Sequence, residues 1–178
     1  MKVPAPERTF HVSGVSKSLA PGLRTGFLIT PPGDALDRVL RAVRALNYAP
    51  PSFGGLIATQ WIEDGTADAI VAEVVAEMTA RLTMARTLLA GAIEAPMSAS
   101  APHLWLPMSE LEAERLAGRA LRAGVELTPP SAPIVAAGAV TGVRLCLGAA
   151  RDRHELEHGL RIVAAALADT DERSRAVI

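Results

Sequence analysis

Cysteine is almost absent from the 178-residue sequence, in which Cys146 is the single thiol. One cysteine excludes an internal disulfide framework, and this scarcity is typical of proteins of a reducing cytoplasm. Because Cys146 falls in an apolar stretch with the pattern of a strand, we interpret it as a small packing residue rather than as a nucleophile. We therefore expect a cytoplasmic protein without a thiol-based site.

The sequence also lacks an excess of charge of one sign. Its 18 lysines and arginines balance 19 aspartates and glutamates, which gives a formal net charge of -1. A nearly neutral chain offers no general electrostatic attraction for nucleic acid or for an anionic membrane surface. We expect this chain itself to make no contact with DNA.

A long apolar run is missing as well. The most apolar window, residues 131–150, is interrupted by Pro133, Thr141 and Arg144, and residues 1–8 lack the apolar core of a signal peptide. These absences predict neither secretion nor a membrane span. What remains is a chain of ordinary domain length with 49% hydrophobic residues, which is enough for a buried core.

Lys17 is the residue around which the first part of the sequence is organised. Residues 9–12 and 26–30, rich in β-branched and aromatic side chains, are predicted to form two strands with Lys17 in the loop between them. A lysine amine that is partly desolvated or lies near a cation loses its proton more readily, and it then forms a Schiff base with an aldehyde. The sequence therefore makes Lys17 a candidate catalytic residue.

Arg24 and three serines give the same loop an anion-binding character. The planar guanidinium of Arg24 matches a phosphate with two hydrogen bonds, and the hydroxyls of Ser13, Ser16 and Ser18 offer further donors. A lysine beside a phosphate cradle predicts a pyridoxal phosphate site with Lys17, Arg24, Ser16 and Ser13 as its cofactor-binding residues. The alternative is that Lys17 and Arg24 are ordinary solvated charges of a loop.

Apolar periodicity divides the rest of the chain into helices and strands. Helices are expected over residues 34–46, 56–63, 66–91, 110–123 and 152–168, and strands over residues 103–106, 125–128 and 143–147. The first of these helices should pack on a sheet, and the long third helix is of the kind that bridges two lobes. Beyond Ala168 we expect a frayed polar tail. The pattern predicts an α/β fold.

Arg144 is the second candidate site residue. On the strand 143–147 it points away from the side of Val143, Leu145 and Leu147, and we expect it to be buried or half-buried. An unpaired charge at such a position costs several kcal/mol. The guanidinium should therefore meet either a carboxylate of the protein or an anionic ligand.

A formal zinc motif lies at the start of the last predicted helix. Residues 154–158 read His-Glu-Leu-Glu-His, the pattern in which two histidines one helical turn apart bind zinc. Both histidines fall away from the apolar stripe of the helix, and only acidic residues of the polar tail follow as a third ligand. We expect neither a metal site nor a zinc protease.

The residues around Lys17 resemble a known cofactor-binding segment. The run Ser-Lys-Ser-Leu-Ala-Pro-Gly-Leu-Arg-Thr-Gly, residues 16–26, is similar to the Schiff-base segment of class I/II aminotransferases of fold type I. Its Pro-Gly-Leu-Arg form is most similar to the aminotransferase-like domain of MocR-type transcriptional regulators in the GntR superfamily. Residues 60–67, Gln-Trp-Ile-Glu-Asp-Gly-Thr-Ala, also resemble MocR-type sequences.

The resemblance implies roles for individual residues. It places the cofactor aldehyde on Lys17 and the cofactor phosphate on Arg24, and it implies that Arg144 grips the α-carboxylate of an amino-acid ligand. The family usually carries a hydroxyl residue three places before the lysine. This sequence has Gly14 at that place, and the serine is one position earlier, at Ser13.

The resemblance covers nearly the whole chain but only the later part of the family's domain. It implies that residues 1–46 belong to the large cofactor-binding domain, residues 47–95 to bridging helices, residues 96–170 to a small C-terminal α/β domain and residues 171–178 to a tail. The groups that stack on the pyridine ring and pair with its nitrogen have no counterpart here, so we expect little power to stabilise a carbanion. The strand pair around Lys17 would have two open edges, which predicts a fragment that self-associates as a homodimer.

Three functions are consistent with these residues. The chain can be the effector-sensing part of a MocR-type regulator, which recognises an amino acid or other amine through pyridoxal 5'-phosphate. It can be the same part of a true aminotransferase, with Lys17 as the base of a proton shift and Arg144 as the substrate anchor. The third possibility is a structural remnant that binds no cofactor. Residues 61–67 favour the first over the second.

Overall fold

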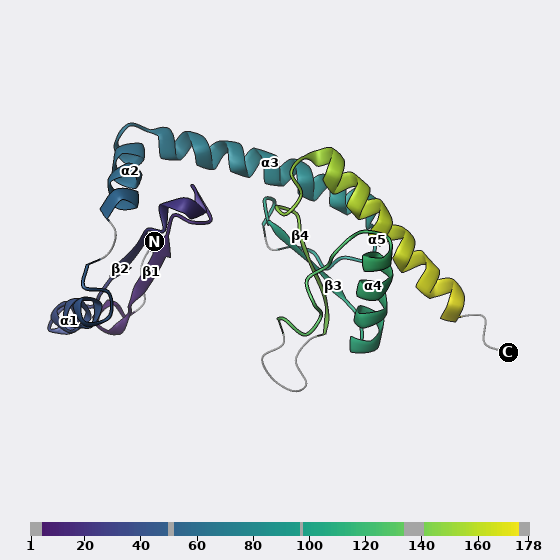
Figure 1. Cartoon of the computed structure of the whole chain (residues 1–178), viewed down its shortest axis with the longest axis horizontal. Coiled ribbons are helices and arrows are strands. Elements are labelled where there is room, and N and C mark those ends of the chain that lie inside the picture. The colour runs from purple at the N-terminus through teal and green to yellow at the C-terminus, as the bar shows by residue number, and fades with distance from the viewer. Residues whose placement is uncertain (1–4, 50–51, 97, 134–140, 175–178) are drawn as a thin grey trace. The chain divides into compact units, whose positions relative to one another are not determined.

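The computed structural model describes residues 5–49, 52–96, 98–133 and 141–174, and of residues 170–174 it describes the backbone alone. By compactness the chain divides into two units, Met1–Val74 and Val75–Ile178. The division falls within helix α3 (Thr66–Leu88), and each unit contains one antiparallel pair of strands (Figure 1). The four-part division predicted from the sequence stays a prediction.

The first unit begins with a short 3-10 helix, η1 (Pro6–Arg8), and a hairpin. Strand β1 (His11–Gly14) pairs with β2 (Gly26–Ile29), and the register joins His11 to Ile29 and Gly14 to Gly26. The loop between the strands carries Lys17, as predicted.

Apolar side chains cover both faces of this hairpin and are exposed. Since side chains alternate along a strand, Phe27 and Ile29 lie on one face, and Val12 and Leu28 lie on the other. Their exposed fractions run from 43% for Leu28 to 76% for Val12. Strands that are apolar on both faces are typical of the interior of a sheet covered by helices on each side.

Two helices follow the hairpin in the first unit. Helix α1 (Ala35–Asn47) has the predicted apolar stripe, yet none of its residues is buried, and Leu36 and Leu40 are 51% and 42% exposed. The expectation that α1 packs on a sheet is therefore wrong for the part of the chain that the structure describes, because no strand there covers the stripe. Helix α2 (Ser52–Glu63) begins four residues earlier than predicted and includes the Gly54–Gly55 pair.

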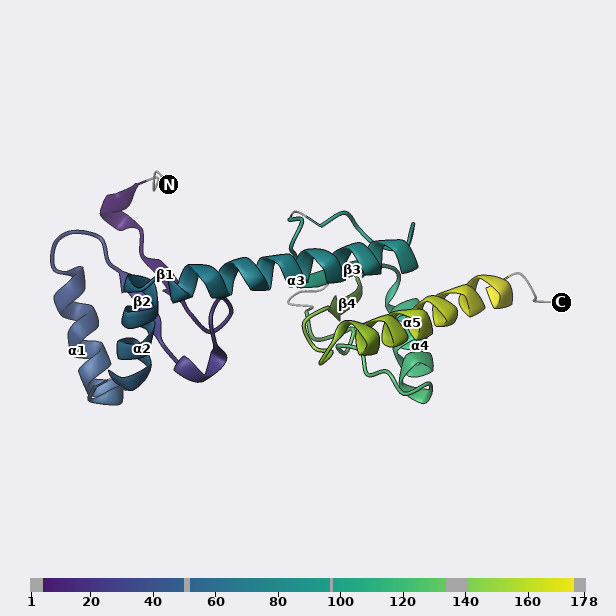
Figure 2. The ribbon, with the colours of Figure 1, turned by 90° about the horizontal axis from the view of Figure 1, so that it is seen from above.

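The second unit has a well-formed core. It contains the end of α3, strands β3 (His103–Pro107) and β4 (Gly142–Cys146), and helices α4 (Glu110–Arg122) and α5 (Arg153–Ser174). Helices α4 and α5 lie side by side (Figures 1 and 2). One cluster of buried side chains joins the helices to the strands: Leu82, Leu89, Leu104, Leu106, Leu116, Val143, Leu147, Leu160 and Val163.

Residues with capping side chains or a left-handed backbone lie at the helix ends of the second unit. Ser109 and Glu112 form a capping box at the start of α4, and Gly124, with φ 91°, follows its end. At the start of α5, Oδ1 of Asp152 accepts from the backbone N–H of Glu155 at 2.8 Å. The Glu155 carboxylate in turn accepts from the backbone N–H of Arg151.

Two predicted features of the second unit are wrong. Residues 125–128 form no strand, because the N–H of Val125 donates to the carbonyl of Ala120 and closes the end of α4. Helix α5 continues to Ser174, beyond the point where we expect fraying. Within the described ranges, no helix combines the length and the apolar composition that crossing a bilayer requires.

Candidate functional site

The loop that carries Lys17 is closed at its base by backbone hydrogen bonds. Val15 is buried, its N–H donates to the carbonyl of Thr25 at 3.2 Å, and its own carbonyl accepts from Leu19 and Ala20 at 2.9 and 3.1 Å. These bonds wind residues 15–19 into a turn. Lys17 lies on the outside of this turn with an exposed side chain.

Arg24 lies near the other end of the same loop. It follows the 3-10 helix η2 (Pro21–Leu23) with a left-handed backbone, φ 47°, and its N–H donates to Pro21 at 3.4 Å. This conformation costs a non-glycine residue about 1–2 kcal/mol. Among the described residues, neither Lys17 nor Arg24 takes part in an ion pair, so both cations are open to an anionic ligand.

Gly54 of α2 shapes the part of the loop next to Arg24, and the sequence analysis missed it. A Cβ at position 54 would overlap the carbonyl oxygen of Leu23 and would lie 2.8 Å from Oγ1 of Thr25. That hydroxyl in turn donates to the Leu23 carbonyl at 2.9 Å. Only a glycine allows the helix to approach so closely. The sequence signal for Gly54 was its position in a glycine pair just before an apolar helical pattern. From sequence alone such a pair is interpreted as part of a loop.

The donor set of this loop fits two ends of pyridoxal phosphate. The amine of Lys17 suits the aldehyde, and the guanidinium of Arg24 suits the phosphate. Ser16 is half-buried within the turn, and Ser13 is exposed on β1. Their hydroxyls are additional donors for the same anion. The roles of these four residues stay predictions.

Arg144 lies in the second unit, on the outer face of β4. The alternation along the strand is confirmed, since Val143 and Leu145 are buried and Arg144 is exposed. The expected burial of Arg144 is wrong, because the described helices cover only the inner face of the strand pair. Cys146 is also exposed on the outer face, so its interpretation as a packing residue is wrong for the same reason. Arg144 has no ion pair in the part of the chain that the structure describes.

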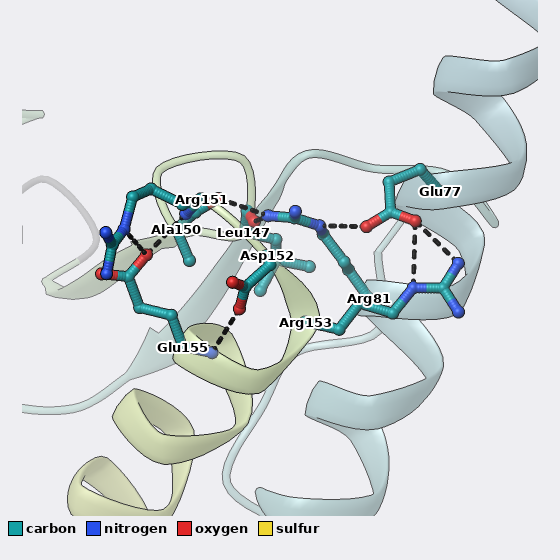
Figure 3. Close-up of polar contacts among 8 residues, drawn as sticks. All are labelled: Glu77, Arg81, Leu147, Ala150, Arg151, Asp152, Arg153 and Glu155. Carbon is teal, nitrogen blue, oxygen red and sulfur yellow. Dashed lines mark hydrogen bonds and ion pairs between the residues drawn. The ribbon is translucent and has the colours of Figure 1, made fainter.

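A buried arginine of α3 fixes the turn that follows β4. Arg81 donates from Nη1 to the carbonyls of Leu147 and Ala150, at 2.8 and 2.9 Å, and from Nε to Glu77 at 2.7 Å (Figure 3). The other oxygen of Glu77 accepts two hydrogen bonds from Arg153, at 2.7 and 2.9 Å. Hydrogen bonds from Arg153 and then Arg81 lower the pKa of Glu77 from 4.5 to about 2. Arg81 therefore holds the segment between the strand of Arg144 and helix α5.

His154 and His158 are exposed on the first turns of α5, as the sequence pattern indicates. Across residues 5–49, 52–96, 98–133 and 141–174, no three His, Cys, Asp or Glu side chains are grouped so that they could hold a metal ion.

No family model matches the chain, and no curated protein sequence matches it either. Solved structures do match. The chain is similar to LysN, an α-aminoadipate aminotransferase from Thermus thermophilus complexed with N-(5'-phosphopyridoxyl)-L-leucine, with 24% identity, a TM-score of 0.73 and coverage of 90% of this chain and 42% of that one. It is also similar to a multiple substrate aminotransferase from Thermococcus profundus, with 20% identity, a TM-score of 0.78 and coverage of 92% and 41%.

A third similar structure is the kynurenine aminotransferase of Pyrococcus horikoshii, with 18% identity, a TM-score of 0.78 and the same shares of the two chains, 92% and 41%. The chain thus spans about two fifths of the length of the structures that it matches. At these identities the likeness shows the fold. That fold is an α/β arrangement found in the C-terminal portion of fold type I aminotransferases.

Proposed function

We propose that this chain is part of a pyridoxal-phosphate-dependent, aminotransferase-like domain, and that the domain senses an amino acid or other amine in a MocR-type transcriptional regulator. The observation that carries the proposal is the loop between β1 and β2. It presents Lys17 and Arg24 without protein partners among the described residues, in a fold shared with aminotransferases. When bound, pyridoxal phosphate acts as an electron sink for bond cleavage at the α-carbon of an amino acid.

Each site residue has one role in this proposal. Lys17 offers its amine to the cofactor aldehyde, and Arg24, Ser16 and Ser13 donate hydrogen bonds to the cofactor phosphate. Arg144, in the second unit, binds the carboxylate of the amino-acid ligand. A second copy of the chain, as a homodimer, is the partner we propose for the exposed hairpin.

A true aminotransferase is the second candidate, because the three solved structures described above are aminotransferases. In that case the amine of Lys17 would also carry the proton that moves during transamination. Assaying a panel of amino acids with a keto-acid acceptor distinguishes the two candidates. Turnover that Lys17→Ala abolishes supports the enzyme, and binding without turnover supports the sensor.

Absorbance tests cofactor binding directly. The sequence has two lysines, Lys2 and Lys17, so the Lys2→Ala variant is a matched control. Adding pyridoxal phosphate should produce a band near the visible edge in the parent and in Lys2→Ala, but not in Lys17→Ala. A flat spectrum in the parent would support the cofactor-free remnant instead.

The phosphate role of Arg24 has its own test. Arg24→Gln should weaken the binding of pyridoxal phosphate about tenfold, because a charge-assisted pair is lost, and should leave the binding of pyridoxal unchanged. Equal weakening of both compounds would mean that Arg24 supports the loop rather than the phosphate.

A further inference from the structure

Helix α1 of the first unit separates its apolar side chains from its charged ones. With about 3.6 residues per turn, its large apolar side chains share one face of the helix, called here the apolar face: Leu36, Val39, Leu40, Val43 and Leu46. The opposite face carries the charged residues of the helix: Arg38, Arg41, Arg44 and Asp37. The helix is therefore amphipathic, and its polar face is basic.

The apolar face of α1 is open to solvent. No residue of the helix is buried, and Leu36, Leu40 and Leu46 are 51%, 42% and 82% exposed. Tyr48, which caps the C-terminal end of α1, is 90% exposed. A contiguous apolar face with a charged rim is typical of a site that binds another protein or a membrane.

The arginines of α1 are not neutralised by the protein. Within the described ranges, none of Arg38, Arg41 and Arg44 takes part in an ion pair. Asp37 is the only acidic residue between Ala35 and Asn47. This basic excess is local, because the formal net charge of the whole chain is -1. A partner that complements α1 is therefore anionic as well as apolar.

Two of the arginines lie at the borders of the apolar face. Arg44 lies four residues after Leu40, so the two side chains are neighbours on the helix surface. Arg38 lies four residues before Ala42, at the other border. An arginine at such a border lays its methylene stem along apolar groups while its guanidinium reaches a phosphate.

An anionic bilayer surface satisfies both faces of such a helix at once. A helix that lies in the plane of the interface buries its apolar face at the boundary between headgroups and acyl chains, and its basic side chains pair with lipid phosphates. Nucleic acid would leave the leucines in water, and an apolar protein groove would leave the arginines without a partner. The charge of α1 therefore favours a membrane over either of these.

We propose that α1 binds the surface of a bilayer that contains anionic phospholipids. The apolar face enters the acyl boundary, the arginines contact the headgroups, and Tyr48 lies at the level between the two, where one end of its ring is apolar and the other is polar. The proposal requires neither Lys17 nor Arg24, so it is independent of the proposed cofactor site.

Flotation of the full-length chain with vesicles in a density gradient tests the proposal, because lipid-bound protein rises whereas aggregated protein sinks. We expect the chain to float with vesicles made of phosphatidylserine and phosphatidylcholine in equal parts, and not with vesicles of phosphatidylcholine alone. Raising the salt concentration should weaken the binding, since salt screens the attraction between exposed charges.

Two matched pairs of variants assign the binding to α1. Arg41→Gln should weaken binding to the mixed vesicles about fivefold. Arg86→Gln, which removes an exposed arginine of α3, should bind like the parent. Leu46→Ala should weaken binding about tenfold, because less apolar surface enters the bilayer. Leu111→Ala, which shortens a leucine of α4 that is 59% exposed, should bind like the parent.

The proposal is overturned if the parent does not float with the mixed vesicles, or if it floats equally with both kinds of vesicle. It is also overturned if Arg41→Gln and Leu46→Ala bind like their controls while circular dichroism shows all four variants folded. Lys17→Ala should float like the parent even though its pyridoxal phosphate band is lost, which separates this result from the test of the proposed function.

Discussion

Among the described residues there are two short antiparallel strand pairs, and only the second has a buried face. Leu104, Leu106 and Val143 of β3 and β4 are at most 2% exposed, whereas Phe27 and Ile29 of β2 are 47% and 65% exposed. Each fully buried side chain of this kind contributes about 1.5–3 kcal/mol to folding. The difference teaches that the unit with Arg144 supplies its own core, while the hairpin with Lys17 has apolar side chains exposed on both faces.

The largest expected difference in stability is between two leucine-to-alanine variants, one in each unit. Leu147→Ala, at a site with 0% exposure, should lower the free energy of unfolding by about 2–5 kcal/mol, because it leaves a cavity in the core. At concentrations where the chain is monomeric, Leu28→Ala on the exposed hairpin should change it by less than about 0.5 kcal/mol. Urea unfolding followed by circular dichroism measures both. Equal losses would show that the hairpin is covered in solution.

The next largest expected effect on stability comes from removing the buried guanidinium of Arg81. Arg81→Met should lower the free energy of unfolding by about 1–3 kcal/mol, because the carbonyls of Leu147 and Ala150 lose their donor. Arg151→Met is the control, since its partner Glu155 lies on the surface and an exposed pair contributes about 0–1 kcal/mol. A smaller loss for Arg81→Met than for Arg151→Met would contradict the role of Arg81 in holding the turn after β4.

In the first unit, neighbouring glycines of α2 should differ. Gly54→Ala places a methyl group against the Leu23 carbonyl and should displace the loop, whereas nothing lies within 4 Å of a Cβ at Gly55. Gly55→Ala should even stabilise the helix, by about 1 kcal/mol. Amide chemical shifts of residues 15–25 should move in Gly54→Ala and stay in place in Gly55→Ala. Unchanged shifts in Gly54→Ala would mean that α2 does not hold the loop.

The smallest expected effect concerns the way in which the free energy of unfolding depends on pH. The pKa of Glu77 is about 2 in the folded chain and 4.5 ordinarily, so its stabilising contribution is complete above pH 4.5 and is lost as the pH falls toward 2. Glu77→Gln should therefore make stability depend less on pH in this window. Glu73→Gln, an exposed glutamate of the same helix, is the control and should keep the pH dependence of the parent. If Glu77→Gln and the parent lost the same free energy of unfolding as the pH falls from 4.5 to 2, the ion-pair network of Glu77 would be contradicted.

Local patterns predicted the elements well, and tertiary contacts explain the failures. Apolar periodicity indicated α1, α4 and α5, because this signal depends on neighbours in sequence. Burial depends on which faces are covered, so the exposure of Arg144 and of α1 could not be read from periodicity.

The residues of the candidate sites also divide into those that a local motif predicts and those that only tertiary contacts bring together. Lys17 and Arg24 lie close in sequence, so a local motif was enough to predict them as site residues, and their roles stay predictions. Gly54 meets their loop from another helix, and Arg81 of α3 holds the turn that follows the strand of Arg144. Such proximity between distant segments leaves no periodic signal in the sequence.

Reductive trapping tests the central claim most directly. The full-length chain is mixed with pyridoxal phosphate, reduced with borohydride, digested, and mapped by mass spectrometry, with Lys2 and the N-terminal amine as internal controls. We predict that the label lies on Lys17 and that its yield falls in Arg24→Gln. A label spread equally over Lys2, Lys17 and the N-terminus would contradict the account, because the loop between β1 and β2 would then be no better a site than any free amine.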